Sequence, residues 1–418
     1  MKYFLTLIQL WVGFLSICAS YPKANIWIIP SVESPQVYRN YAQTSKVHLE
    51  MARGEVEHIQ LVFPSKVNEE YRFTFDRYLK GIQISARELK KMNGYYDALV
   101  PFKNQLKCTD TLTAVWITVQ CPSRVPVGKY HQTIKIEGSK HFTIQLDYNV
   151  HHTTIPLKSS IPITVGVENR CMTECLNDKE ADKERQRWVD FVLSYRMTPV
   201  FGTQITPERW QYEHSFSPWA WNDKRSIRLL NDRRYSCYML PFFTLSENEL
   251  ASLLCNIQKK GKLKESLFYI WDEPAYMEDY EQIKRKVNII RKYASDARIL
   301  TTFFCGPRNG PRKGDLYAVF DYLKHHIHVA TISLAPCKGN EEEVQHIRYK
   351  VPEGIDWWSY VCWQPGGNEP NFLLQMKGIQ QRAIMWRTWK NGSQGFLYWN
   401  CNIYHKRNPF TYITDMPH

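Results

Sequence analysis

The sequence predicts an α/β protein in which a (β/α)8 barrel follows an N-terminal β-sandwich domain. Short runs of alternating polarity fill the first part of the chain, and this alternation is typical of half-buried antiparallel strands. Beyond residue 156, eight short apolar runs alternate with helical patterns over about 250 residues, which is the size and order of a barrel. A doubly wound parallel sheet is the alternative.

The N-terminal sandwich is expected to span residues 21–155. Polar and apolar residues alternate within 131–136 and 142–146, as they do in strands with one face in a core. The predicted strands are 26–29, 58–63, 72–75, 81–85, 113–119, 129–136 and 141–150. This part shows no catalytic constellation, so we expect it to pack against the following domain and stabilise it.

The chain begins with a predicted secretory signal peptide, residues 1–20. Lys2 precedes an apolar run over residues 3–18, and Ala19-Ser20 offers a small-residue cleavage site. We therefore expect a secreted or lumenal protein, extracellular or lysosome-like, with no stable membrane span after cleavage. The run approaches spanning length, so an uncleaved signal anchor is the alternative.

Cysteine usage agrees with an oxidising compartment. Eleven cysteines, less Cys18 in the signal peptide, leave ten, an even number that favours disulfides over metal sites or free thiols. Cys108 and Cys121 flank a predicted strand, and we expect them to staple a hairpin. Asn391 begins an Asn-Gly-Ser glycosylation motif, which predicts a surface loop.

The formal net charge of +13 favours anionic partners such as acidic glycans or membrane headgroups. Nucleic acid is not an expected partner, because lysine and arginine are scattered or lie in short groups such as residues 259–262. No nucleic-acid-binding module surrounds them. Most of the charge is therefore interpreted as solvated surface.

The barrel domain is expected to span residues 156–418. Its predicted strands are 161–167, 199–202, 236–241, 266–271, 298–304, 328–334, 356–362 and 395–399. Helical spacing of apolar residues falls at 178–195, 247–258, 276–293, 341–349 and 372–390. Within the last helix, the residues Met376, Ile379, Ala383 and Trp386 form a stripe that we assign to the core.

The fourth predicted strand ends in two adjacent carboxylates, Asp272 and Glu273, followed by Pro274. This position places both carboxylates at the carboxyl ends of the strands, where barrel enzymes carry their sites. The alternative is that Asp272 caps the following helix and Glu273 favours its positive end.

Other polar and aromatic residues follow predicted strands on the same face. Aromatic rings stack on the C–H face of a sugar, and the sugar hydroxyls need donors and acceptors. The candidate substrate-binding residues of this kind are Arg170, Arg308, Trp363, Tyr398, Trp399 and Asn402. We expect no cofactor and no metal, because the His325-His326-Ile327-His328 cluster enters its strand from the amino end.

Adjacent carboxylates fit a substrate-assisted reaction better than an ordinary glycosidase. The ordinary pair lies across the scissile bond, roughly 5 to 9.5 Å apart, whereas neighbours on a regular strand point to opposite faces. In a substrate-assisted reaction the sugar's 2-acetamido oxygen attacks the anomeric carbon. One carboxylate then orients the acetamido group, and the other donates a proton to the leaving oxygen. A nearby anion raises the pKa of that donor.

Several segments, in this order, match the pattern of a known family. They are 52–57, 60–62, 127–130, 269–274 (Tyr-Ile-Trp-Asp-Glu-Pro), 357–360 (Trp-Trp-Ser-Tyr), 370–371, Arg382, Trp386, Trp389 and 395–399 (Gly-Phe-Leu-Tyr-Trp). On these residues the chain resembles glycoside hydrolase family 123. The resemblance implies an exo-acting β-N-acetylgalactosaminidase in which Asp272 holds the acetamido group and Glu273 is the general acid/base. Three aromatic residues of the matching segments, Trp271, Trp358 and Tyr360, join the candidate substrate-binding residues.

The sequence thus predicts a secreted, retaining exo-glycosidase that works through an oxazolinium intermediate. Its expected partners are glycolipids or glycoproteins that end in β-linked N-acetylgalactosamine, or in N-acetylglucosamine, and no oligomeric state is predicted. One alternative is a non-catalytic glycan-binding protein on the same barrel. Another is a two-carboxylate glycosidase that pairs Glu273 with Glu168.

Overall fold

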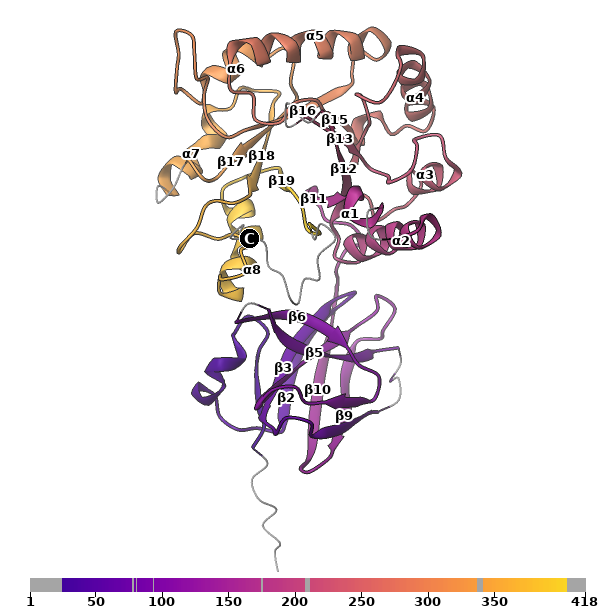
Figure 1. Cartoon of the computed structure of the whole chain (residues 1–418), viewed down its shortest axis with the longest axis vertical. Helices are drawn as coiled ribbons and strands as arrows, with labels where there is room; N and C mark the ends of the chain where they lie inside the picture. The colour runs from indigo at the N-terminus through magenta and orange to yellow at the C-terminus, as the bar shows by residue number, and fades with distance from the viewer. Residues whose placement is uncertain are drawn as a thin grey trace, which may run out of the picture.

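The structure is a computed structural model that describes residues 25–76, 79, 81–92, 94–173, 176–206, 211–336 and 341–403. Two parts follow one another along the long axis of the molecule (Figure 1). The N-terminal part is made chiefly of strands, and the C-terminal part surrounds a sheet with helices. The predicted signal peptide, residues 1–20, lies outside the described residues. Within the described ranges, no helix has both the length and the apolar character needed to cross a membrane.

Ten strands of the N-terminal part are described. They are β1 (Trp27–Pro30), β2 (Lys46–Arg53), β3 (Val56–Pro64), β4 (Glu70–Phe75), β5 (Gln83–Met92), β6 (Tyr95–Pro101), β7 (Gln105–Lys107), β8 (Leu112–Gln120), β9 (Gly128–Glu137) and β10 (His141–Thr154), with a 3-10 helix at Pro35–Asn40. They form two five-stranded sheets, with the orders β1-β3-β8-β5-β6 and β2-β10-β9-β4-β7.

One buried cluster joins these two sheets. Leu61 of β3 and Val115 of β8 belong to it together with Phe73 of β4 and Ile144 of β10. Buried residues alternate with more exposed ones along β10, as its polar and apolar alternation predicts for a strand with one face in a core. Removal of these apolar faces from water holds the two sheets together.

The C-terminal part is built on a sheet in which nine strands are described. They are β11 (Ile163–Glu168), β12 (Thr198–Thr206), β13 (Gln211–Ser215), β14 (Tyr238–Met239), β15 (Ser266–Tyr269), β16 (Arg298–Phe303), β17 (Val329–Ser333), β18 (Asp356–Val361) and β19 (Gly395–Tyr398). All are parallel to their neighbours except β13, which is antiparallel to β12. The order β13-β12-β11-β19-β18-β17-β16-β15-β14 follows the chain around the sheet, without the reversal of a doubly wound sheet.

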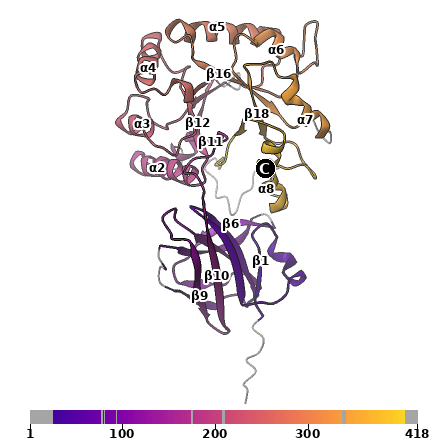
Figure 2. The same cartoon turned by 180° about the vertical axis from the view of Figure 1, so that it is seen from behind.

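The two edges of this sheet nearly close on each other. Strand β13 turns back along β12, and the backbone N–H of Phe216, just after β13, donates to the carbonyl oxygen of Met239 in β14 at 2.7 Å. Strand β14 has only two residues, so the contact across the join is short. The sheet is therefore barrel-like, and helices surround it (Figure 2).

Helices connect the parallel strands and lie outside the sheet. They are α1 (Asn169–Thr173), α2 (Asp178–Ser194), α3 (Lys224–Leu229), α4 (Glu247–Lys259), α5 (Met277–Tyr293), α6 (Ala318–Leu323), α7 (Glu341–Lys350) and α8 (Gly378–Lys390), with a 3-10 helix at Leu263–Glu265. Local sequence explains where several begin. The side chain of Asn177 accepts a hydrogen bond from the N–H of Glu180 at α2, and Ser246 forms a capping box with Glu249 at α4.

Successive side chains along a strand pack into two different cores. On β15, Leu267 and Tyr269 belong to a cluster dominated by strand residues, which fills the inside of the sheet. Phe268 and Ile270 instead belong to the large cluster between the sheet and the helices. This period of two determines which side chains at the strand ends face inward.

A strand lies at each of the eight positions predicted in the C-terminal part, and a helix at each of the five. Strand β13 is an addition, because its sequence Gln-Tyr-Glu-His-Ser has no apolar alternation. The predicted core stripe on the last helix is wrong, since Ile379 is 53% exposed and Trp386 is 68% exposed. Helix α8 packs on the sheet through the face of Ile384 and Thr388 instead.

Two predictions about surface chemistry are also wrong. Cys108 and Cys121 are free, and they lie beyond opposite ends of β8. Nine residues of strand span roughly 30 Å, whereas a disulfide needs Cα atoms within about 7 Å of each other. Asn391 is 2% exposed at the end of α8, so it does not lie in a surface loop. Among the other described cysteines, Cys237, Cys255, Cys305, Cys362 and Cys401 are also free.

Gly395 offers a test of packing inside the sheet. A methyl group at this position would lie 2.2 Å from a ring carbon of Trp358, which is 2% exposed. We expect Gly395→Ala to lower the free energy of unfolding by about 1–3 kcal/mol, because the buried indole has little room to move. Urea unfolding followed by circular dichroism measures this. Gly366→Ala is the control, since nothing lies within 4 Å of its added carbon. Equal stability of the two variants would contradict this account of the packing.

Candidate active site

Asp272 and Glu273 lie between the end of β15 and the start of α5. They are thus at the carboxyl ends of the parallel strands, where sheets of this kind bind ligands. The helix-cap alternative is wrong. The carboxylate of Asp279 accepts hydrogen bonds from the N–H groups of Ala275 and Tyr276, both at 2.9 Å, where α5 begins.

Two hydroxyl groups hold Asp272 in place. Tyr269 donates to Oδ1 of Asp272 at 2.7 Å, and Thr302 donates to the same oxygen at 3.0 Å. The two hydroxyl oxygens are 2.9 Å apart. Because Tyr269 ends β15 and Thr302 lies in β16, two adjacent strands together orient this carboxylate.

The surroundings of Asp272 combine dense protein with access to solvent. Burial raises the pKa of its carboxyl, and the hydrogen bonds from Tyr269 and Thr302 oppose that rise. The side chain nevertheless has an exposed side. A ligand can therefore reach the carboxylate, while the protein around it keeps the local dielectric low and makes its charge act strongly.

Glu273 leaves the regular path of the strand. Its φ of 46° is in the left-handed region, which residues other than glycine rarely adopt. Its N–H donates to the hydroxyl oxygen of Thr302 at 3.0 Å, and its Oε1 accepts a hydrogen bond from the hydroxyl of Tyr360 in β18. Since the backbone turns here, the rule that strand neighbours face opposite sides does not apply to this pair.

The environment of Glu273 favours its protonated form. Burial is the main cause that raises the pKa of this carboxyl, and the negative charge of Asp272 raises it further. The hydrogen bond from Tyr360 and the charge of Arg308 act in the opposite direction. A carboxyl with a raised pKa keeps its proton to higher pH, as a general acid requires.

Strand β13 supports the site from the side. The imidazole of His214 stacks on the ring of Tyr269, with centroids 4.0 Å apart and planes at 23°. Burial lowers the pKa of His214 to about 3, so the ring is neutral near pH 7. It fixes Tyr269 without placing a positive charge beside Asp272. Tyr212 on the same strand lies close enough to Asp272 for that charge to raise its pKa, after the larger effect of burial.

The loops after β15 and β16 are tied to each other. The N–H of Arg308 donates to the carbonyl oxygen of Ala275 at 2.7 Å, and the N–H of Met277 donates to Oδ1 of Asn309 at 2.9 Å. These bonds fix the turn that carries both carboxylates. Asn309, at the end of this link, lies in the loop that follows β16.

The structure brings four of the predicted site residues together: Asp272, Glu273, Tyr360 and Arg308. Tyr360 contacts Glu273 directly, whereas Arg308 is exposed and acts on Glu273 through its charge. Trp363 lies two residues beyond β18 and is 46% exposed. Part of its indole is therefore accessible from solvent near this edge of the sheet.

Three other predicted residues have packing roles. Trp358 is 2% exposed inside the sheet, and Asn402 is 1% exposed, so neither side chain offers surface to a substrate. Asn402 instead bonds the backbone of Glu168, accepting from its N–H at 2.6 Å. Trp271 packs outward, with the Lys286 ammonium 5.9 Å from its ring. The predicted substrate contacts of Trp358 and Asn402 are wrong for this reason.

The remaining predicted residues lie around the ends of β11 and β19. Tyr398 packs edge to face on Phe372, with centroids 4.9 Å apart, and Trp399 is partly buried beside Gly166. Arg170 is exposed, and its N–H donates to the carboxylate of Glu168 at 3.1 Å. Because Glu168 is only 6% exposed, the alternative that pairs it with Glu273 gains no support.

Sequence analysis missed three residues that hold the pair: Tyr269, Thr302 and His214. Thr302 could have been found, because it lies two residues after the inward-facing Leu300 in β16 and so faces inward itself. Tyr269 could have been found in the same way on β15. His214 had no such signal, since β13 was not predicted.

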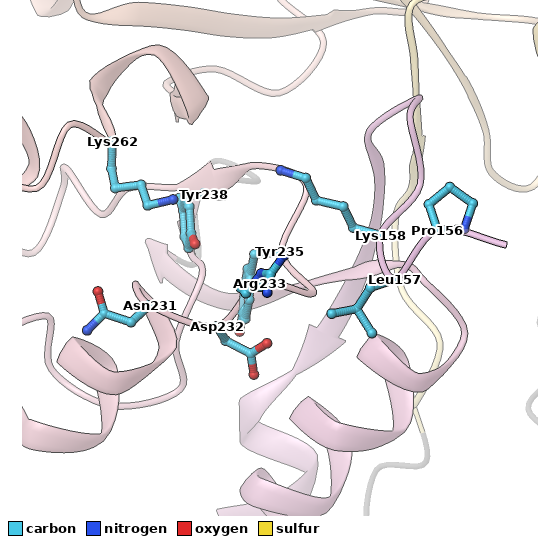
Figure 3. Close-up of a pocket in the computed structure, with 9 residues that line it drawn as sticks. All are labelled: Pro156, Leu157, Lys158, Asn231, Asp232, Arg233, Tyr235, Tyr238 and Lys262. Carbon is cyan, nitrogen blue, oxygen red and sulfur yellow. The ribbon is translucent and has the colours of Figure 1, made fainter. Parts of the chain in front are cut away.

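Figure 3 shows the residues that line a cavity of 420 Å³, and neither Asp272 nor Glu273 is among them. Its lining includes Lys158 and Lys262, and Lys262 precedes β15 whereas Asp272 follows it. Both lysines approach the carboxylate of Glu265, at 3.9 Å and 2.9 Å. The cavity thus lies at the amino ends of the strands, and much of its charge is balanced within the protein. No group of three or more His, Cys, Asp or Glu that could hold a metal ion occurs in the part of the chain that the structure describes.

A barrel-like sheet with carboxylates at the carboxyl ends of its strands is an arrangement that glycoside hydrolases use. The family model described as "Glycoside hydrolase 123, catalytic domain" matches residues 183–416, which is more than half of the chain. The chain belongs to glycoside hydrolase family 123, and it is therefore a hydrolase of glycosidic bonds. This confirms the resemblance that the sequence motifs predict.

One solved structure agrees with this fold. A family 123 glycoside hydrolase from Clostridium perfringens, described for glycolipid glycan hydrolysis, has a TM-score of 0.62 and 13% identity, covering 92% of this chain and 80% of that chain. A GH5 xyloglucanase from Bacteroides ovatus has a TM-score of 0.32 and 10% identity, covering 90% of this chain and 95% of that chain. The comparison with curated proteins found no match.

Tyr269→Phe tests the role of the hydroxyl that orients Asp272. We expect a loss of about tenfold to a hundredfold in kcat, since a hydrogen bond to a charged group contributes about 1.5–3 kcal/mol. The loss is near tenfold if the remaining hydrogen bond from Thr302 still orients Asp272. Steady-state kinetics on an aryl glycoside measures the change. Tyr293→Phe is the control, because its hydroxyl bonds Glu247 on the outer helices. Unchanged kcat in Tyr269→Phe would contradict the role.

Proposed function

We propose that the protein is an exo-acting hydrolase of terminal β-linked N-acetylgalactosamine, with N-acetylglucosamine as the less favoured epimer. The observation that carries the proposal is the adjacent pair Asp272 and Glu273, in which each carboxylate has its own hydroxyl partners. Membership of family 123 supports the substrate class. The description of the Clostridium perfringens enzyme supports glycolipid glycans as natural substrates.

Asp272 is assigned to the acetamido group. Its Oδ1 receives the hydrogen bonds of Tyr269 and Thr302, and both of these bonds leave its Oδ2 unused. Oδ2 can therefore accept the acetamido N–H of the substrate. The negative charge of Asp272 then stabilises the positive charge that develops as the acetamido oxygen bonds to the anomeric carbon.

Glu273 is assigned to proton transfer. In the first step the acetamido oxygen forms a bond to the anomeric carbon, the glycosidic bond breaks, and Glu273 gives its proton to the leaving oxygen. In the second step the Glu273 carboxylate takes a proton from water, whose oxygen bonds to the anomeric carbon and opens the oxazolinium ring. Two inversions at one carbon leave the configuration retained.

The same proposal includes the finer architecture. Eight parallel strands in chain order, with β13 inserted beside β12, support a (β/α)8 barrel over residues 156–418. Two sheets that share one buried cluster support a β-sandwich over residues 21–155. The boundary between them would fall in the segment that joins β10, which ends at Thr154, to β11, which begins at Ile163.

Secretion is also part of the proposal, and it rests on the apolar run of residues 3–18. The free cysteines among the described residues give secretion no added support. The expected location is extracellular or lumenal, where glycolipid and glycoprotein glycans are displayed.

Hydrolysis of paired aryl substrates tests the activity. We expect release from the β-N-acetylgalactosaminide to exceed release from the glucosaminide, and no release from a β-galactoside, which has no acetamido group. Glu273→Gln should lose about 10²–10⁴ in kcat, because general acid catalysis contributes about that much. The loss should be smaller with a dinitrophenyl leaving group, which needs no proton.

Asp272→Asn provides the matched comparison. It should lose about 10²–10³ in kcat on acetamido substrates, since it keeps the shape and removes the charge. A thiazoline mimic of the cyclic intermediate should inhibit the wild type and bind this variant weakly. Activity on the β-galactoside, or wild-type turnover by either variant, would exclude the substrate-assisted mechanism.

The pH dependence of kcat/KM separates the two carboxylates. The Tyr360 hydrogen bond lowers the pKa of Glu273, so Tyr360→Phe should raise that pKa and move the basic limb, where the acid loses its proton, to higher pH. The Tyr269 hydrogen bond lowers the pKa of Asp272, so Tyr269→Phe should move the acidic limb, where Asp272 gains a proton, to higher pH. Movement of the same limb in both variants would contradict the assigned roles.

A further inference from the structure

Helix α8 has an apolar face that does not contact the sheet. Trp386 and Trp389 are each 68% exposed, and Ile379 is 53% exposed. At 3.6 residues per turn these side chains lie within about 80° of one another, on the side opposite Ile384, which packs on the sheet. Large apolar side chains that gather on the surface of a soluble protein mark an interaction site.

The end of α7 extends this surface. An added carbon at Gly392, just after α8, would lie 3.2 Å from the side chain of Arg348, so the ends of the two helices are neighbours. The Arg348 guanidinium lies 4.5 Å from the ring centroid of Tyr349, which is 70% exposed. We call this surface the α8 face. It consists of Lys377, Ile379, Arg382, Trp386, Trp389, Lys390, Arg348 and Tyr349.

The α8 face is cationic as well as apolar. Residues 370–414 contain no Asp or Glu, whereas the whole chain has a net charge of +13. Three cations of α8 and its N-cap are exposed: Lys377, Arg382 and Lys390. The fourth, Arg387, is buried and pairs with Glu369 at 2.9 Å, so it is not part of the surface. Glu57 of β3 is near enough to Arg382 for that charge to act on its pKa.

We propose that the α8 face docks on a lipid bilayer that contains anionic headgroups. Tryptophan favours the headgroup level of a bilayer, and exposed lysine and arginine are attracted to anionic lipid. Ile379, in line with the two tryptophans, can enter the acyl boundary. Aromatic, aliphatic and basic groups on a helix whose own sequence has no acidic residue are the pattern of an interfacial helix.

Two other occupants fit the surface less well. In a symmetric dimer the cations of the α8 face would meet the same cations of a second copy, which is unfavourable. A soluble acidic glycan could pair with the cations and stack on the tryptophans, but it gives no role to Ile379. Docking on a bilayer goes beyond the proposed function, and it does not require that Asp272 and Glu273 catalyse hydrolysis.

Vesicle sedimentation tests the proposal with the full chain. Wild-type protein should bind phosphatidylcholine vesicles that contain phosphatidylserine more tightly than phosphatidylcholine vesicles alone, and salt should weaken the binding. Trp386→Ser/Trp389→Ser should lower the partition coefficient about tenfold or more, because two apolar contacts with the bilayer are lost. Lys377→Gln/Lys390→Gln should lower it about tenfold on the anionic vesicles alone.

Phe191→Ser/Tyr195→Ser is the matched control. Phe191 of α2 is 53% exposed, and Tyr195, just after that helix, is 48% exposed. Helix α2 lies on the other side of the ring of helices from α7 and α8 in both views (Figures 1 and 2). The control should bind as the wild type does. All four proteins carry the same residues 1–20, so any difference between them comes from the helices. Circular dichroism and thermal unfolding show whether each variant is folded. If Trp386→Ser/Trp389→Ser does not fold, the single variant Trp389→Ser is used in its place.

Three results would overturn the proposal. The first is equal sedimentation of the wild type with anionic and neutral vesicles. The second is wild-type partition by the folded tryptophan variant. The third is binding of a soluble sulfated polysaccharide, lost in the tryptophan variant, with no binding to vesicles. None of these depends on turnover, so failure here is distinguishable from failure of the proposed hydrolysis.

Discussion

The hydroxyl group of Thr302 is the contact on which the site depends. It accepts a hydrogen bond from the N–H of Glu273 at 3.0 Å and donates one to the carboxylate of Asp272 at 3.0 Å. One side chain of β16 thus holds both acidic residues. This is possible only because β15 and β16 are parallel neighbours, with Tyr269 paired to Leu300. The left-handed turn at Glu273 then brings its N–H to the strand next to it. Sheet register, rather than the carboxylates themselves, sets the geometry of the pair.

Much of the fold and the location of the pair could be predicted from the sequence. Strands that are buried on both faces appear as short apolar runs, and their alternation with helices fixes their order around a barrel-like sheet. The position of Asp272 and Glu273 follows from that order alone. In the N-terminal part seven of the ten described strands were predicted, among them β10, whose residues alternate between more exposed and buried from His141 to Val150. Strands β2, β6 and β7 were not predicted.

The parts that could not be predicted depend on contacts between elements distant in sequence. An apolar helix residue such as Trp386 is core or surface according to which face meets the sheet, and spacing alone does not decide this. Trp358 follows a strand pattern, yet it lies in the interior because Gly395 on the next strand leaves room for its ring. His214 depends on β13, a polar strand that exists because it pairs with β12. Each case is a tertiary effect that local pattern does not encode.

Tyr269, Thr302 and Asp272 form a triangle of three contacts, but their two hydroxyl groups supply only two hydrogens for them. Each hydroxyl carries one hydrogen, and three short contacts, of 2.7, 3.0 and 2.9 Å, join the three groups. While Asp272 is an anion, both hydrogens can point at its Oδ1, and the two hydroxyl oxygens then face each other without a hydrogen between them. When the positive charge of the proposed oxazolinium ring lies beside Asp272, one hydroxyl can turn toward the other instead. Rotation of a single O–H bond could thus adjust the negative potential at this edge of the sheet without any movement of the backbone.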